Sequence, residues 1–221
     1  MILPVVILGR PGKLGGFLGT GFFIEDESFF ITAAHNVELS GVQFGVLHVE
    51  DSLNALPVSV VYIDKQSDIA VLEVNGYHPL KGFALAHPEE LYLNTQISCL
   101  EYGTTLTRGD EIRFNPAFRL GNVTRSFSKL EILGRVLTDA LEVSFPALRG
   151  ASGAPVLINS NFRVIGMLVG NMSYHLLPSQ IETVTDEAGK IIEETKFMLP
   201  LGIAAHANAI RTAVQAILGK K

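Results

Sequence analysis

Residues 149–156 read RGASGAPV, with two glycines, two alanines and a proline around a single serine, Ser152. The stretch has no helical or strand periodicity and almost no side chain to bury. A serine hydroxyl becomes a nucleophile when a base takes its proton and donors stabilise the charge on the attacked carbonyl oxygen. Glycine before the serine lets the chain turn tightly and point successive N–H groups into one small space. Alone, the stretch is more simply a glycine-rich turn.

Two further motifs change that interpretation. The segment FFITAAH, residues 29–35, is an apolar strand followed by two alanines and His35, whose ring can pack closely against such small neighbours. The segment SDIAVLEV, residues 67–74, places Asp68 directly before an apolar strand. Each would be ordinary alone, as a strand-end histidine and a capping aspartate. Together they give the order His, Asp, Ser, which differs from the Ser, Asp, His order of α/β-hydrolases and the Asp, His, Ser order of subtilisins.

Short apolar runs separated by turn residues fill most of the chain. Examples are PVVIL, PVSVVYI, TQISCLEY and RVIGMLVG, spaced by about ten residues and rich in Val, Ile and Phe, which predicts an all-β sandwich or barrel. The polar segment 177–196 predicts a long exposed hairpin or mobile loop with EAGK as its turn. Near the end, an apolar stripe predicts one helix that begins after Asn208 as N-cap and closes at Gly219.

Composition excludes several classes of protein. The 221 residues carry a net charge of -5 with no basic block, so we expect no nucleic-acid partner. No apolar run reaches the roughly 18 residues that would span a bilayer, so we expect no membrane contact. The N-terminal run stops at Gly9 and lacks the pattern of a secretory signal, which favours a cytoplasmic protein.

Cysteine and histidine usage narrows the chemistry. The single cysteine, Cys99, allows no internal disulfide and is predicted to be a buried strand residue rather than a nucleophile. The six histidines show no ligand spacing such as HExxH, so we expect neither a metal nor any other cofactor.

The three motifs resemble those of chymotrypsin-type (trypsin-like) serine peptidases. GTGFFIEDESFFITAAH is similar to that family's G-S-G-F-x-I and T-A-A-H opening, SDIAVLEV to its D-I-A-L-L segment, and RGASGAPV to G-D-S-G-G-P or G-N-S-G-G-P. RVIGMLVGN resembles the strand that lines the substrate cleft. KFMLPLGIAAHANAI resembles the final strand and helix of disulfide-free bacterial trypsin-like peptidase domains, the closest members. The similarity is scattered from residue 19 to the C-terminus.

The resemblance implies two six-stranded antiparallel β-barrels with the active site between them and a C-terminal helix. The segment 76–94, with two prolines and no strand-like alternation, is the expected connection. We therefore predict an N-terminal barrel over residues 1–90 and a C-terminal barrel over residues 91–221, with the helix at about 207–219.

Carried over to this sequence, the resemblance implies a serine endopeptidase that works through an acyl-enzyme on a protein or peptide substrate. His35 would be the general base, Asp68 its orienting partner and Ser152 the nucleophile. The N–H groups of Gly150 and Ser152 would form the oxyanion hole.

The resemblance also indicates a substrate pocket. Pro146 would lie at the pocket base, and Val169, Gly170 and Asn171 would line its wall. No acidic residue occupies that base, so a preference for arginine or lysine is not expected, and an apolar or small side chain is expected instead. His175 lies just beyond this wall and is expected to be a surface residue.

The sequence departs from the family at Ala151, where many relatives carry Asp or Asn. In zymogen-activated members, that Asp pairs with a new N-terminal amine, which Ala151 cannot do. We therefore expect no activation of that kind. A loop held by packing alone would be loose in the free protein, and peptide binding would order it. Ala154 replaces a family glycine and is a small change.

Two other hypotheses stay open beside an active endopeptidase. A catalytically silent domain could keep the fold and hold a partner in its cleft, and an effector domain could need an activating protein partner. The complete set of His35, Asp68 and Ser152 favours the active enzyme.

Overall fold

The computed structural model describes most of the 221-residue chain. The described residues are 1–10, 13–25, 29–48, 55–77, 81–108, 111–132, 134–176, 181–189, 191–196 and 198–219.

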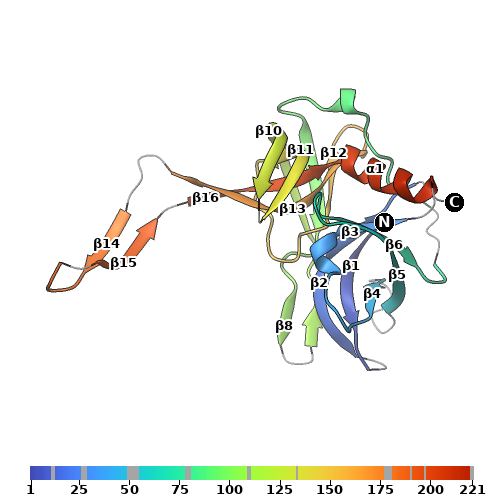
Figure 1. The fold of residues 1–221 in the computed structure, drawn as a ribbon, viewed down its shortest axis with the longest axis horizontal. Helices are drawn as coiled ribbons and strands as arrows, with labels where there is room; N and C mark the ends of the chain where they lie inside the picture. Colours follow the sequence, from blue (N-terminus) through green and yellow to red (C-terminus); the bar gives the residue numbers. More distant parts are fainter. Residues whose placement is uncertain are drawn as a thin grey trace.

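The first half of the chain forms a closed antiparallel barrel with the strand order β1-β2-β3-β6-β5-β4 (Figure 1). Its strands are β1 (Ile2–Leu8), β2 (Leu14–Phe23), β3 (Phe30–Ala33), β4 (Phe44–Leu47), β5 (Ala55–Asp64) and β6 (Ile69–Val74). Inward-facing apolar side chains fill this barrel, among them Phe23, Phe30, Val46 and Leu72, all fully buried. Closure leaves no sheet edge to cover.

The second half forms another closed antiparallel barrel with the strand order β10-β11-β16-β13-β12-β7. Its strands are β7 (Gln96–Glu101), β10 (Ala117–Ile132), β11 (Arg135–Val143), β12 (Pro155–Ile158), β13 (Val164–His175) and β16 (Met198–His206). Cys99 is fully buried inside it, and that burial raises the pKa of its thiol well above its usual value. The predicted all-β fold with two six-stranded antiparallel barrels is confirmed, and Cys99 is a buried strand residue as expected.

The short connections add little to these barrels. The β8 (Leu106–Arg108) and β9 (Glu111–Arg113) strands form a small separate hairpin. One-turn 3-10 helices lie at η2 (Ala34–Asn36) and η3 (Pro88–Glu90).

The predicted C-terminal helix is α1 (Ala207–Leu218), which packs against both barrels. Its buried face contains Ile210, Val214 and Ile217. The prediction of Asn208 as N-cap was wrong, because strand β16 continues to His206 and the His206 ring accepts the N–H of Asn208 at 3.0 Å. Within the described part of the chain, no helix is long and apolar enough to cross a membrane.

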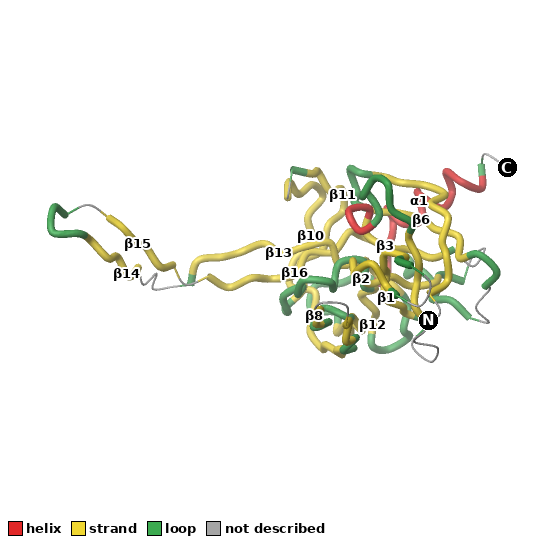
Figure 2. The backbone as a smooth tube through the Cα atoms, turned by 90° about the horizontal axis from the view of Figure 1, so that it is seen from below, coloured by secondary structure: helices red, strands yellow, loops and turns green. Residues whose placement is uncertain are grey.

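A long two-stranded arm leaves the second barrel. Strands β13 and β16 run beyond the barrel as a ribbon, and β14 (Ile181–Thr185) and β15 (Ile191–Lys196) form a hairpin at its far end (Figures 1 and 2). In both views the hairpin projects away from the barrels. The predicted exposed hairpin is therefore present, with its turn at residues 186–189, while residues 177–180 and Lys190 lie outside the described residues.

Candidate active site

Strand pairing in the first barrel brings His35 and Asp68 together. Strands β3 and β6 are antiparallel, with Ala33 opposite Ile69. The residues that follow β3 and those that precede β6 therefore leave the sheet at the same end. The N–H of Ala34 donates to the Asp68 carbonyl at 3.0 Å, which fixes the two segments side by side.

Asp68 holds His35 through both of its carboxylate oxygens. Oδ2 lies 2.7 Å from the imidazole Nδ1, and Oδ1 accepts the His35 backbone N–H at 3.1 Å. The Asp68 side chain is only 2% exposed, whereas that of His35 is 35% exposed. Asp68 has a φ of 57°, a left-handed conformation that aspartate tolerates better than most residues. This geometry fixes the orientation of the imidazole ring through its Nδ1 edge.

Ser152 lies in a tight turn of the second barrel. Gly150 and Gly153, on either side of it, have φ values of 93° and 89°. A Cβ at Gly153 would lie 2.0 Å from the Thr20 carbonyl oxygen, so only glycine fits there. The N–H of Gly153 donates to the Leu168 carbonyl at 2.8 Å, which ties the turn to strand β13.

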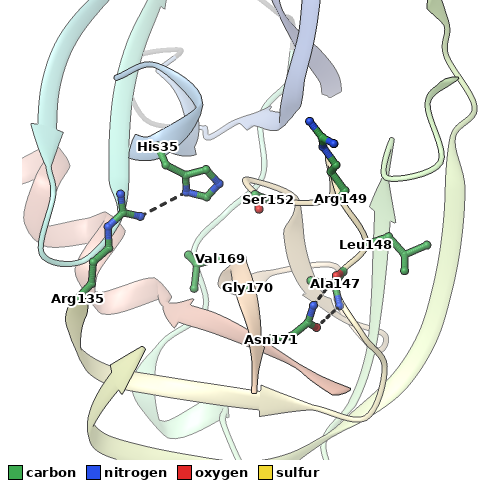
Figure 3. Close-up of a pocket in the computed structure, with 9 residues that line it drawn as sticks. All are labelled: His35, Arg135, Ala147, Leu148, Arg149, Ser152, Val169, Gly170 and Asn171. Atoms are coloured by element: carbon green, nitrogen blue, oxygen red, sulfur yellow. Dashed lines mark hydrogen bonds between the residues drawn. The ribbon is translucent and has the colours of Figure 1, made fainter. Parts of the chain in front are cut away.

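His35 and Ser152 line the same cavity of about 540 Å³, one from each barrel. Figure 3 shows a dashed line from one imidazole nitrogen of His35 to Arg135, while the other nitrogen lies on the side of the ring that faces Ser152. The front and back halves of the chain therefore meet in one groove, as the motif order requires. A second cavity of about 330 Å³ lies next to it, and Arg149 borders both.

Arg135 is a member of this site that the sequence did not indicate. It begins strand β11, yet its Nη1 forms an ion pair with Asp68 Oδ1 and lies 3.4 Å from His35 Nδ1. Its Nη2 lies 3.5 Å from Glu38 Oε2. The Arg135 side chain is 20% exposed and fills one wall of the cavity (Figure 3).

The three residues predicted to form the wall of a substrate pocket line the cavity that holds His35 and Ser152, and one of them forms a bridge that the sequence did not indicate. Val169, Gly170 and Asn171 line the cavity. The Asn171 side chain accepts the N–H of Ala147 and donates to its carbonyl, both at 2.7 Å (Figure 3). The bridge therefore joins two residues that both line this cavity. Pro146, the predicted base, is not among the described residues that line this cavity.

The loop of residues 150–152 is held by hydrogen bonds, so the expectation that packing alone holds it was wrong. The Gly150 carbonyl accepts the Thr20 hydroxyl at 2.9 Å, and the Ser152 carbonyl accepts the Thr20 N–H at 2.9 Å. The amide of Asn36 also donates to the Ser152 carbonyl, at 3.0 Å.

Among the residues that the structure describes, no three His, Cys, Asp or Glu side chains come together as a metal site requires.

A family model, the trypsin-like peptidase domain, matches residues 19–167. The match covers the segments that carry His35, Asp68 and Ser152. The chain belongs to the trypsin-like peptidase family. No sequence among curated proteins matches this trypsin-like peptidase.

Solved structures share the fold of this trypsin-like peptidase at low sequence identity. A serine-to-alanine mutant of Rv3671c from M. tuberculosis H37Rv, in an inactive form, is 17% identical, with a TM-score of 0.62 over 100% of this chain and 87% of that one. The MamO protease domain from Magnetospirillum magneticum is 15% identical, with a TM-score of 0.58 over 96% and 94% of the two chains. The HtrA-type protease AlgW, with a decapeptide, is 12% identical, with a TM-score of 0.66 over 99% and 64%. Family and fold together support a serine protease.

The sequence analysis did not single out three residues that lie at the site. Thr20 lies inside the GTGFF motif between two glycines, and a polar residue in that apolar motif was the signal that could have marked it. Arg135 had no local signal, because the sequence around it shows only an apolar strand. Arg149 precedes the glycine of the serine motif and lies exposed at the junction of the two cavities.

Proposed function

We propose that this chain is a serine endopeptidase that cleaves peptide bonds through an acyl-enzyme. Ser152 Oγ attacks the carbonyl carbon of the substrate, and His35 takes the hydroxyl proton and passes it to the leaving amine. Water, deprotonated by the same imidazole, then releases the acyl group from Ser152. The observation that carries this proposal is the His35 ring, bonded to buried Asp68 on one edge and facing Ser152 across a shared cavity.

The loop before the nucleophile supports an oxyanion hole at Gly150 and Ser152. Within the described residues, neither backbone N–H has a hydrogen-bond acceptor, while both carbonyls are bonded to Thr20. Unpaired donors beside a nucleophile are what a developing oxyanion needs. We infer that these two N–H groups bind it, and removing one such donor typically costs about 3 kcal/mol of transition-state stabilisation.

Strand β13 offers an edge for the substrate backbone. Its pairing with β12 ends at Met167, while its pairing with β16 continues to His175. From Val169 onward, no described strand pairs with the other edge of β13. A peptide can add there as an antiparallel strand beside Ser152. The Asn171 bridge narrows the adjoining pocket, which favours a small residue at the cleavage position.

A cytoplasmic location and control by an activating protein partner also stay proposals. The single buried Cys99 is compatible with a reducing compartment, because the fold needs no disulfide. A peptidase in such a compartment would need control, which a partner could provide.

A fluorophosphonate probe tests the proposed function, since it labels only an activated serine. We expect covalent labelling of the wild-type chain and at least 1000-fold slower labelling of Ser152→Ala and His35→Ala. Circular dichroism must show that both variants fold. A folded wild-type chain that takes no label, alone or with added protein partners, would leave the silent peptide-binding module as the better hypothesis.

A further inference from the structure

Thr20 lies at the contact between the two barrels, directly behind the nucleophile loop. It is fully buried in strand β2. Its hydroxyl donates to the Gly150 carbonyl at 2.9 Å and accepts the Tyr102 N–H at 3.1 Å. Its own N–H donates to the Ser152 carbonyl at 2.9 Å. One residue of the first barrel therefore holds the carbonyls on both sides of Ala151.

The conformation of the loop decides where the Gly150 N–H points. The Ala151 N–H donates to the Leu148 carbonyl at 2.8 Å and closes a four-residue turn. Gly150 is the third residue of that turn, and its φ of 93° fits a type II turn. In a type I turn, the same position would need a φ near -90° and the peptide between Arg149 and Gly150 would be reversed.

The Tyr102 end of this network is anchored by a buried ion pair. Glu101 is fully buried, and its Oε1 lies 2.8 Å from both Nε and Nη2 of Arg119. Its other oxygen accepts the N–H of Gly103. The Gly103 turn packs against the loop, since a Cβ there would lie 3.2 Å from the Ala151 Cβ. The Glu101 carboxylate, the turn at Gly103 and the Thr20 hydroxyl thus form one continuous chain of contacts.

We propose that Thr20 is a positioning residue that keeps the Gly150 N–H directed into the cleft in the absence of substrate. This inference rests on the proposed peptidase function. Ala151 carries no charge that could anchor the loop, so the Thr20 hydroxyl supplies the anchor. Without it, the Gly150 carbonyl and the Tyr102 N–H would both be buried without partners. The loop would then move to satisfy them, and the turn could reverse.

Thr20→Val tests this role, because it keeps the side-chain shape and removes the hydroxyl. With a peptide substrate, we expect kcat to fall about tenfold or more while KM changes less than twofold. Thr20→Ser restores the hydroxyl and is expected to recover most of kcat. Thr212→Val is the matched control, since it loses one hydroxyl bond to the Asn208 carbonyl on the exposed face of α1. Unchanged kcat in Thr20→Val, or an equal loss in Thr20→Ser, would overturn the proposal.

Amide hydrogen exchange gives a second readout that needs no catalysis. In a Ser152→Ala background, we expect the Tyr102 N–H, which loses its acceptor, to exchange at least tenfold faster in Thr20→Val than in the Thr20 parent, with core amides unchanged. Equal exchange would contradict the role of Thr20, even if the wild-type chain hydrolyses peptides. Conversely, an inactive wild-type chain with the expected exchange difference would refute only the proposed function. If Thr20→Val does not fold, Thr20→Ala replaces it in both measurements.

Discussion

Arg135 lies at the candidate active site although the sequence around it gives no sign of that position. It reaches from the second barrel to Asp68 and Glu38 in the first, so one side chain links the Asp68 carboxylate to the second barrel. We expect Arg135→Gln to lower kcat/KM roughly 10- to 100-fold, because a bond to a charged partner is lost and Asp68 can shift. Steady-state hydrolysis of a peptide substrate measures this.

The control for Arg135→Gln is Arg163→Gln. Arg163 Nη1 lies 3.5 Å from Glu90 Oε2, and Arg163 lines neither of the two cavities at the candidate site. The Arg163→Gln variant is expected to leave kcat/KM unchanged. Thermal unfolding of both variants separates misfolding from a local effect. Full activity in a folded Arg135→Gln would show that Asp68 needs only His35 to hold it.

Asn171 should decide which side chain the pocket admits. Its amide bonds to both polar groups of the Ala147 backbone, and both residues line the cavity that holds Ser152. We expect the wild-type chain to prefer alanine over phenylalanine at the cleavage position. Asn171→Gly opens the bridge and should raise the kcat/KM ratio of phenylalanine to alanine peptides at least tenfold. Matched peptides that differ only at that position provide the measurement.

Asn161→Gly makes the same change on the exposed surface, where Asn161 bonds to Glu90. It should not alter that ratio. If Asn171→Gly also keeps the wild-type ratio, the bridge does not limit the pocket and its size must be set deeper.

The sequence could predict those site residues whose role is fixed by their immediate neighbours. Ser152 needs a bare turn, and His35 needs small residues beside it, so both leave a local pattern. Arg135 and the Asn171 bridge leave none, because their partners are distant in the sequence and become neighbours only through barrel pairing. Thr20 is intermediate, since its motif is local but its bonds to Gly150 and Tyr102 are not.

Among the elements, helix α1 depends on an N-cap that can be protonated. The ring of His206 accepts the Asn208 N–H, and only the neutral imidazole can do so. Burial lowers the pKa of His206 below its ordinary value of 6.5, with a smaller lowering from Arg211 and an opposing effect from Asp139. The unfolded chain therefore binds this proton more tightly than the folded protein. The His206 contribution is intact above pH 6.5 and is lost as the pH falls below it.

His206→Asn keeps a capping acceptor that does not titrate in this range. We expect the free energy of unfolding to decline less between pH 7 and pH 5 in this variant than in the wild-type chain. Urea unfolding at several pH values measures the difference in slope. His175→Asn removes an exposed histidine on the arm and should keep the wild-type slope. An unchanged slope in His206→Asn would show that the cap is not the titrating group.

Most strands and the helix were predictable from the sequence, but the pairing of the strands with one another was not. Alternating apolar runs reveal strands, and the stripe along Ile210, Val214 and Ile217 reveals the helix, because both patterns are local. Barrel closure depends on pairings such as β1 with β4 and β10 with β7, which join residues far apart in the chain. The error at the helix start has a similar origin, since the pairing of β16 with β13 carries the strand to His206.

At the scale of the whole molecule, the arm is the part that projects away from the two barrels. Its base is clamped to the second barrel by Glu142, which is 2% exposed and accepts the Tyr174 hydroxyl. Thr124 also donates to Glu142, at 2.8 Å, and the Arg125 guanidinium lies over the Tyr174 ring at 5.5 Å. These contacts end before the far hairpin, so the anchor and the hairpin are separable.

Replacing residues 176–197 with a two-residue Asn-Gly turn should therefore leave the two barrels and the active site intact. Strands β13 and β16 face each other up to His175 and Met198, so a short turn can join them just beyond the clamp. We expect the same midpoint of thermal unfolding within about 4 °C and the same kcat/KM on short peptides, because no described residue of the hairpin lines the cavity that holds His35 and Ser152. Loss of hydrolysis in a folded variant would instead make the arm part of the active enzyme. Reduced cleavage of a folded protein substrate alone would assign the arm to substrate capture, a role that its reach away from the barrels would suit.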